Sequence, residues 1–337
     1  MEHKLCRTST VRHAGTGVTL NTPLLVPSFS SKGFKPGDLK AIFETSSGFI
    51  TETYLISAYD IGHGHLPEPR KLLFTPELMF LDSGGYEISS DQDISAVEFA
   101  KAGHKDWSVD QLTKVLDAWP DEIPTVIVSY DHPKDRKSFE EQIKAARRLF
   151  KGRAHLCTFL IKPQTEEEET LKSALDEAKV HAREMKSFEI IGVTEKEIGR
   201  SPLERMVNLA KLRKAMDEAG VGSPIHVFGA LDPLSACLYF LAGAEIFDGL
   251  TWIRYAYDEN GRCVYGSNHG AINFGLDVRE NEVKSRFMSG NIYLMAQLQR
   301  KLREFDVKGQ FAKLEPHAKT LKDALDTLET ALKKGGF

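Results

Sequence analysis

Short apolar runs recur along the chain, and most are followed by turn residues and by a segment whose apolar positions have helical spacing. Runs that are almost continuously apolar are typical of strands buried on both faces. The pattern predicts eight strands, at Leu24–Phe29, Phe49–Leu55, Leu78–Asp82, Thr125–Asp131, His155–Lys162, Phe188–Val193, Pro224–Ala230 and Ala244–Leu250.

Helical patterns fall between most of these strands. They predict helices at Pro36–Glu44, Ser108–Ala118, Lys137–Phe150, Thr165–Met185, Ser201–Ala219 and Pro233–Ala242. Strands that alternate with helices indicate a parallel architecture, and eight is the strand number of a closed βα barrel. We therefore expect an α/β fold, a (β/α)8 TIM barrel. An open doubly wound sheet is the alternative, but it favours a glycine-rich phosphate loop after the first strand, and Ser28–Gly33 is a poor match.

The two ends of the chain have other patterns. Scattered Thr, Val and Gly over Thr8–Thr22 predict an N-terminal β-hairpin. Two amphipathic, highly charged patterns, Val278–Phe305 and Leu314–Lys334, predict C-terminal helices. Between them and the last strand, Thr251–Phe274 predicts a hairpin around Asp258–Gly261 followed by a loop. We expect a barrel over residues 1–275 and a helical extension, packed on the barrel, over residues 276–337.

Composition narrows the class of protein. The 337 residues are 41% hydrophobic and 27% charged, as in a soluble globular protein. No apolar run approaches the ~20 residues that span a bilayer, and the N-terminus lacks an apolar signal core, so a cytoplasmic protein without membrane contact is expected. The four cysteines form no CxxC-type pair, so no structural metal site is expected. With a net charge of −4, any nucleic-acid binding must come from local basic patches.

Acidic residues collect at the C-terminal ends of the predicted strands, where a barrel has its active site. Asp82, Asp131 and Asp248 end the third, fourth and eighth strands. Carboxylates crowded into one pocket raise the pKa of at least one of them, so that one can attack while another carries a proton. Cleavage of a glycosidic bond through a covalent intermediate needs these two roles. A single aspartate at a strand end is, however, more often a helix N-cap or a turn residue.

Other rim residues suit a flat ligand. Glycines after the third, sixth and seventh strands would make room for it, and aromatic residues could stack on its two faces. The glycines are Gly84, Gly85, Gly192 and Gly229, and the aromatic residues are Tyr86 and Phe228. Glu52, Thr53 and Tyr54 are expected at the end of the second strand, and Lys162 and Gln164 at the end of the fifth. His155, His226 and His269 are interpreted as structural, and Phe228 could also belong to the core.

The order of these motifs resembles the tRNA-guanine transglycosylase superfamily. The segment LDSGGYE, at Leu81–Glu87, is similar to the family signature, in which DSGG is followed by an aromatic residue and usually Gln. Other segments resemble family strands in the same order. They are TPLLVPSFSSKGFKP, FITETYL, VSYDHP, FEIIGV, VFGALDP and EIFDGLTWIR. The similarity covers about residues 7–274 and implies a (β/α)8 barrel enzyme, a pentosyltransferase that exchanges bases without a cofactor.

The resemblance also implies roles for individual residues. Asp248 matches the nucleophile that attacks the sugar C1′, and Asp82 matches the general acid/base. The base-binding positions are implied at Ser83, Gly84, Gly85, Tyr86, Asp131, Gln164, Gly192, Val193, Phe228 and Gly229. Arg254 follows the nucleophile at the family spacing, and we expect it to contact nucleic acid, with Lys134 and Arg136. For the basic residues near the fourth strand, a solvated helix face is an equally good interpretation.

The chain also departs from the family pattern. It lacks the CxCxxC zinc motif, Glu87 replaces the usual Gln, and Glu52 replaces the usual Asn of the second strand. We therefore expect a divergent paralogue that inserts a 7-deazaguanine into DNA or tRNA, with DNA slightly favoured because the zinc subdomain is missing. A catalytically silent binding subunit and a barrel hydrolase of nucleosides or glycosides are the alternatives. A homodimer and a separate partner subunit both stay open.

Overall fold

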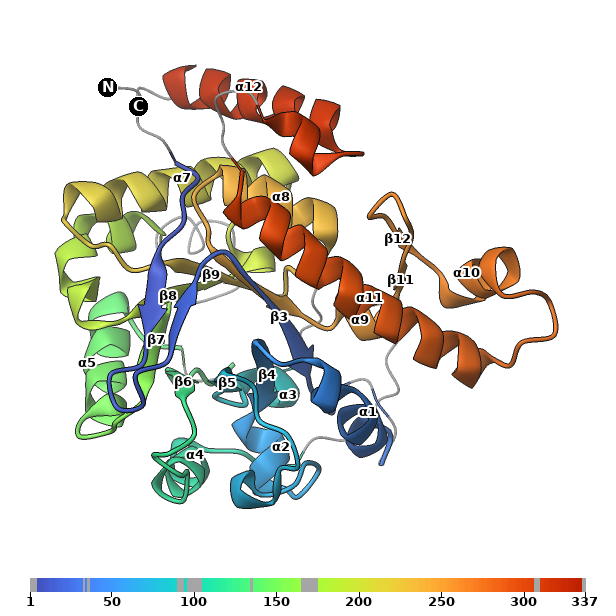
Figure 1. Cartoon of the computed structure of the whole chain (residues 1–337). Helices are drawn as coiled ribbons and strands as arrows, with labels where there is room; N and C mark the ends of the chain where they lie inside the picture. Colours follow the sequence, from blue (N-terminus) through green and yellow to red (C-terminus); the bar gives the residue numbers. More distant parts are fainter. Residues whose placement is uncertain are drawn as a thin grey trace.

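The computed structural model describes residues 5–32, 34, 37–89, 94–95, 105–133, 136–164, 175–305 and 310–334. Eight parallel strands form a closed barrel in the order β10-β3-β4-β5-β6-β7-β8-β9, which confirms the predicted TIM barrel (Figure 1). These strands are β3 (Leu24–Phe29), β4 (Thr53–Ser57), β5 (Leu78–Asp82), β6 (Thr125–Val128), β7 (Leu156–Leu160), β8 (Ile190–Thr194), β9 (Ile225–Phe228) and β10 (Ile246–Gly249).

Helices surround the barrel. They are α1 (Asp38–Ser46), α2 (Ala58–Gly62), α3 (Gly85–Ile88), α4 (Val109–Asp117), α5 (Phe139–Phe150), residues 175–180, α7 (Pro202–Glu218) and α8 (Pro233–Leu241). Side chains satisfy the first N–H groups of several helices, which explains where these helices begin. Ser108 and Ser201 accept from the backbone three residues on, and Ser138 forms a capping box with Glu141.

Two hydrophobic layers hold the barrel together. Inside it, alternate residues of the strands pack into one cluster, for example Leu24, Phe80 and Ile190. The other residues of the same strands, such as Ile127 and Phe159, pack outward against the helices. The predicted N-terminal hairpin, β1 (Thr10–Arg12) with β2 (Thr19–Asn21), is confirmed. Its buried side chains Val11 and Leu20 join the inner cluster, so the hairpin covers one end of the barrel.

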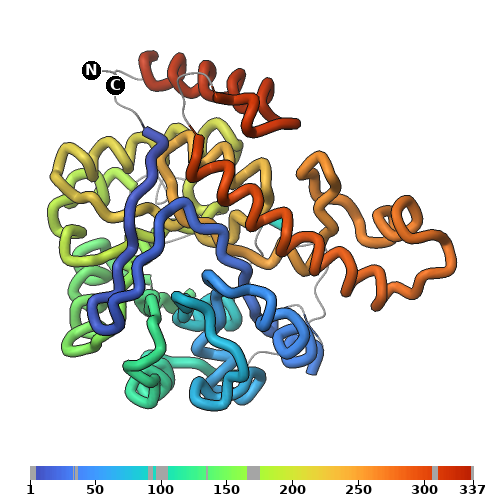
Figure 2. Tube along the Cα trace, viewed as in Figure 1, coloured from blue at the N-terminus to red at the C-terminus, as the bar shows by residue number. Residues whose placement is uncertain are grey.

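The C-terminal helices pack on this barrel. Figure 2 shows α11 (Glu280–Arg303) running beside the β3 segment. Gln299 of α11 accepts a hydrogen bond from the backbone of Leu25 at 2.6 Å. The last helix, α12 (Ala318–Lys334), lies on α7 and α8. None of the described helices is long and apolar enough to cross a membrane.

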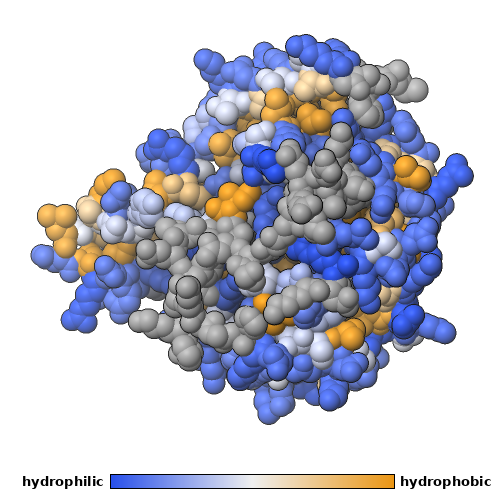
Figure 3. Space-filling model, turned by 180° about the vertical axis from the view of Figure 1, so that it is seen from behind, coloured by the Kyte–Doolittle hydropathy of each residue, from blue (hydrophilic) through white to orange (hydrophobic). Residues whose placement is uncertain are grey.

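An arm projects from the barrel before α11. The short helix α9 (Thr251–Arg254) leads into the predicted hairpin, formed by β11 (Ala256–Tyr257) and β12 (Cys263–Val264). The segment after the hairpin, expected to be a loop, is instead the helix α10 (Gly266–Asn273). Ile272 and Leu276 on this arm are more than four-fifths exposed, and hydrophobic atoms gather there in Figure 3.

The second strand begins later than its apolar pattern predicts. Phe49 closes a 3₁₀ turn and is largely exposed, and β4 starts only at Thr53. Glu52 therefore stands at the opposite end of the barrel from the expected rim, where Gln299 and Arg303 of α11 bind its carboxylate. The expected rim positions of Glu52, Thr53 and Tyr54 are wrong, since Thr53 and Tyr54 begin β4. Ser57 ends the strand instead and is paired in register with Asp82.

The predicted helix at Thr165–Met185 falls only partly on described residues. Residues 175–180 are helical, and a 3₁₀ helix covers Ala182–Ser187. Residues 165–174 lie outside the described residues.

Candidate functional site

A pocket opens at the C-terminal ends of the strands. Asp82, Asp131 and Asp248 all line it, as expected from their places at the ends of three strands. Glycines, aromatic side chains, hydroxyl groups and further charged groups complete the wall. They include Ser28, Ser30, Gly85, Tyr86, Glu87, Arg136, Lys162, Thr194, Glu195, Phe228 and Gly229.

Asp248, on β10, is held by three donors, which come from β3, from β9 and from the residue after β9. The Ser28 hydroxyl donates to its Oδ2 at 2.7 Å. Its Oδ1 lies 3.0 Å from Nε2 of His226 and 3.3 Å from the backbone N–H of Gly229. Each carboxylate oxygen can accept two hydrogen bonds. Among the described residues Oδ1 has two partners and Oδ2 one, so Oδ2 is the oxygen with room for a reacting atom.

Asp82, at the end of β5, is a second carboxyl of the pocket, and its pKa is raised. Burial and the negative charges of Asp131 and Asp248 raise its pKa to about 7, although the Gly84 N–H, at 3.0 Å from Oδ2, acts in the opposite direction. A carboxyl with this pKa exchanges a proton readily near neutral pH. Asp82 can therefore serve as acid or base beside Asp248.

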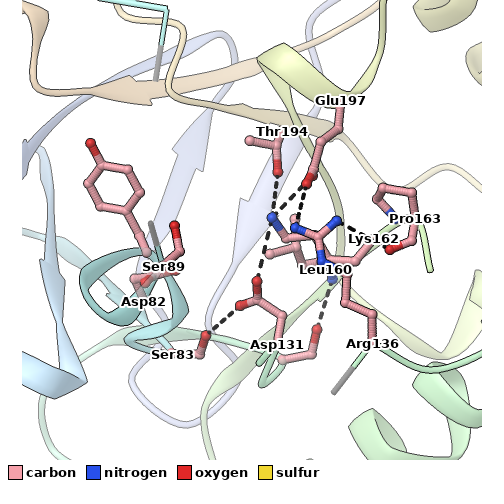
Figure 4. A network of polar contacts seen from close by, with 12 residues as sticks. Asp82, Ser83, Ser89, Asp131, Arg136, Leu160, Lys162, Pro163, Thr194 and Glu197 are labelled. Carbon is pink, nitrogen blue, oxygen red and sulfur yellow. Dashed lines mark hydrogen bonds and ion pairs between the residues drawn. The ribbon is translucent and has the colours of Figure 1, made fainter. Parts of the chain in front are cut away.

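Asp131, which follows the neighbouring strand β6, is fixed by a polar network (Figure 4). The Ser83 hydroxyl donates to its Oδ1 at 3.1 Å, and the Lys162 ammonium lies 3.4 Å from its Oδ2. Lys162 also contacts Glu197 at 3.1 Å and the Thr194 hydroxyl at 3.1 Å. Burial acts to lower the pKa of Lys162, but Glu197 and Asp131 outweigh it, so the pKa is raised and the ammonium stays charged.

The two aromatic residues lie on different walls of the pocket. Tyr86, in α3, has the Lys32 ammonium 4.0 Å from its ring centroid, and Arg254 donates to its hydroxyl at 3.3 Å. Phe228, at the end of β9, has one face stacked on the His226 ring, with centroids 3.8 Å apart. Both side chains line the pocket, so a planar ligand between them would meet aromatic surface.

The glycines of this rim are required by close packing. A Cβ on Gly85 would lie 2.4 Å from Oδ1 of Asp131, and one on Gly192 would lie 2.7 Å from the Phe228 ring. Gly84 has φ near +92°, and a Cβ there would meet the Trp107 indole at 2.5 Å. Gly192 thus leaves room for Phe228, Gly85 lets the turn after β5 lie against Asp131, and Gly84 lets the same turn lie against Trp107.

Substitution Gly85→Ala is expected to destabilise the protein by about 1–3 kcal/mol, because the new methyl group overlaps both the side chain and the backbone oxygen of Asp131. Gly222→Ala is the matched control. Nothing lies within 4 Å of a Cβ at Gly222, so a change below about 0.5 kcal/mol is expected there. Chemical denaturation measures both values, and equal stability of the two variants would contradict the packing argument.

Some residues assigned from the sequence do not have the positions or contacts expected of them. Gln164 is exposed and does not line the pocket, whereas Lys162, two residues earlier, does. The side chain of Val193 packs outward against the helices. The Arg136 side chain is only 7% exposed and pairs with Glu197 at 3.2 Å. Lys134 lies outside the described residues.

Ser28, Glu87 and His226 were given no role in the site from the sequence. His226 and Ser28 contact Asp248 directly, and Glu87 was noted only as a departure from the family pattern. Strand periodicity could have indicated His226, because it lies two residues before Phe228 and therefore points to the same face of β9.

Glu87, like Asp82, is a carboxyl of the pocket with a raised pKa. It accepts hydrogen bonds from the hydroxyls of Ser30 at 2.5 Å and Ser57 at 2.8 Å. Burial and the charges of Asp60 and Asp82 raise its pKa to about 8. The folded protein therefore keeps this proton at pH values where the unfolded chain has released it.

Glu87→Gln is expected to stabilise the protein at pH 8 by up to about 4 kcal/mol, with little effect near pH 4.5. The folded pKa is the higher one, so wild type loses stability as pH rises from about 4.5 to about 8, while the amide does not titrate. Denaturation curves measured from pH 4.5 to 8 check this. A difference between the proteins that does not grow with pH would contradict it.

Neither a scan against models of protein families nor a search of curated proteins finds a match to this chain. Membership of the transglycosylase superfamily therefore stays a prediction.

Proposed function

We propose that the protein is a transglycosylase that exchanges guanine in a polynucleotide for a 7-deazaguanine through a covalent glycosyl-enzyme intermediate. The pairing of Asp248 and Asp82 in one pocket is the observation that carries this proposal. Three donors orient Asp248, and the pKa of Asp82 is raised to about 7 by burial and by its acidic neighbours. Covalent glycosyl transfer needs one carboxylate as nucleophile and another as proton carrier.

In the first half of the proposed reaction, Oδ2 of Asp248 attacks C1′ of the sugar. The bond from C1′ to N9 of guanine breaks, its electron pair passes to the base, and Asp82 supplies the proton that neutralises the leaving base. The sugar is then held as an ester of Asp248. The raised pKa of Asp82 supports this step, because a carboxyl with a pKa near 7 is a competent acid at neutral pH.

In the second half, the incoming base occupies the same place. Asp82, now ionised, removes the proton from N9 of the 7-deazaguanine, and N9 attacks C1′. The ester bond breaks, its electron pair returns to Asp248, and Asp82 is protonated again. The two half-reactions balance without a cofactor, since the same carboxyl releases one proton and recovers it.

The remaining walls suit a guanine-like base. Asp131 presents an acceptor to the N–H edge of such a base, and Ser83 and Lys162 hold it in place. Tyr86 and Phe228 supply aromatic surface on two walls. We propose that these residues select the base by its hydrogen-bonding edge and its flat shape.

The polynucleotide is proposed to be DNA or tRNA, with DNA slightly favoured because the family's zinc subdomain is missing. Arg254, which binds the Tyr86 hydroxyl, lies beside the pocket and is our first candidate for a phosphate contact. The target base must be unpaired or turned out of its helix to reach Asp248.

Incubation of the protein with labelled guanine and either tRNA or duplex DNA tests the proposal. Incorporation of label, or a trapped covalent adduct, would support it. Release of the base without any incorporation would favour a hydrolase. Activity that appears only with a co-purified partner would favour a binding subunit. Absence of exchange and of adduct on both polynucleotides, also with a 7-deazaguanine, would rule the proposal out.

A further inference from the structure

His226 lies between the nucleophile candidate and the stacking wall. It is fully buried in β9. Its Nε2 is 3.0 Å from Oδ1 of Asp248. One ring face stacks on Phe228 at 3.8 Å, and Phe80 approaches edge-on with centroids 5.5 Å apart. The ring is thus fixed by aromatic contacts on two sides while its nitrogen is directed at the carboxylate.

The surroundings of the second ring nitrogen favour one tautomer. Nδ1 of His226 is buried and has no hydrogen-bond partner among the described residues. An imidazolium would bury a second N–H donor without an acceptor, which costs more than burying a lone pair. The neutral ring with its proton on Nε2 fits the site, because this form donates to Asp248 and needs no other donor or charge partner.

We propose that His226 is a positioning residue that donates its Nε2–H to Asp248 and couples the nucleophile to the base-stacking wall. The inference rests on the proposed function. The N–H groups of His226 and Gly229 occupy the two acceptor positions of Oδ1 of Asp248, which leaves Oδ2 to attack C1′. Because the same ring supports Phe228, a base stacked on Phe228 and the attacking oxygen share one rigid support. His226 takes no proton in this reaction.

Two substitutions separate the hydrogen bond from the packing. His226→Phe keeps an aromatic ring under Phe228 and removes the donor, so the rate of adduct formation is expected to fall about 10- to 100-fold with little change in KM. His226→Gln keeps an N–H donor near the position of Nε2, and it is expected to recover most of that loss. His155→Phe, at another buried histidine outside the pocket, is the matched control and should leave the rate unchanged.

Equal losses in His226→Phe and His226→Gln would overturn the inference, because packing alone would then explain both. An unchanged rate in His226→Phe would also overturn it. A higher KM with an unchanged rate would mean that His226 shapes the base pocket and does not position the nucleophile. This result would also contradict the proposed role.

A second readout needs no substrate. Nitrogen NMR of ¹⁵N-histidine-labelled protein, assigned with His226→Gln, is expected to show the Nε2–H tautomer and a low-field Nε2–H proton that moves in Asp248→Ala. An Nδ1–H tautomer, or a proton resonance unaffected in Asp248→Ala, would overturn the inference. If wild type forms no adduct with any polynucleotide, the proposed function fails, and this resonance alone decides whether His226 holds Asp248.

Discussion

Asp248→Asn is expected to abolish covalent adduct formation and to lower base exchange by about 10⁴-fold or more, the order of loss when a covalent nucleophile is removed. An amide oxygen cannot form the ester with C1′ at a useful rate. The site itself should survive the change. The amide oxygen can still accept from His226 and Gly229, and the amide nitrogen can donate to the Ser28 hydroxyl.

Denaturing gels of the protein with labelled tRNA or DNA measure the adduct, and thermal denaturation checks that the variant is folded. Asp258→Asn is the matched control, because Asp258 lies in the turn of the β11–β12 hairpin, away from the pocket. Full exchange activity in Asp248→Asn would show that another group is the nucleophile.

The second large effect is expected at Asp82, where Asp82→Asn should slow adduct formation by about 10²- to 10⁴-fold. In wild type, the rate of adduct formation should fall as pH rises through about 7, because the leaving guanine needs the proton of Asp82. The variant should lose this dependence. Single-turnover rates between pH 5.5 and 9 measure it, and a flat wild-type profile would contradict the assignment.

A substrate with a better leaving group isolates the role of Asp82. In a nucleotide, 7-methylguanine carries a positive charge, so it can leave as a neutral base without being protonated. A polynucleotide with 7-methylguanine at the target position should therefore restore much of the rate of Asp82→Asn and none of the rate of Asp248→Asn. Equal rescue of both variants, or rescue of neither, would contradict the assignment of Asp248 as the nucleophile and Asp82 as the general acid.

The folded stability of Asp82→Asn provides a further check. The pKa of Asp82 is higher in the folded protein than in the unfolded chain, so the wild-type carboxyl costs stability increasingly from about pH 4 to about pH 7. The amide carries no charge to bury. The variant should therefore be at least as stable as wild type at pH 8, and a large loss of stability would attribute its inactivity to misfolding.

Much of the candidate site followed from one rule about barrels. Residues at the C-terminal ends of the strands meet at one rim, so Asp82, Asp131 and Asp248 could be brought together from their positions in the chain. The rule depends on the strand end being placed correctly. It failed for Glu52, because Phe49 and Ile50 extended the apolar pattern before the true start of β4.

The orientation of single residues on the strands was harder to predict. Barrel strands are buried on both faces, so their sequences lack the alternation that tells inward from outward positions. Val193 therefore could not be assigned to the outer layer. The error at Gln164 has another origin: the resemblance placed it in the pocket, but β7 already ends at Leu160, and Lys162 lines the pocket instead.

The sequence by itself determined the eight-strand barrel, its two terminal additions and the three acidic strand ends, because periodicity and turn chemistry are local properties of the chain. Only the tertiary structure showed that Ser28 and His226 hold Asp248. Closure of the barrel pairs β10 with β3 and β9, and so brings residues 220 positions apart into hydrogen-bonding distance. No local pattern contains that register, which is fixed by the packing of the whole barrel.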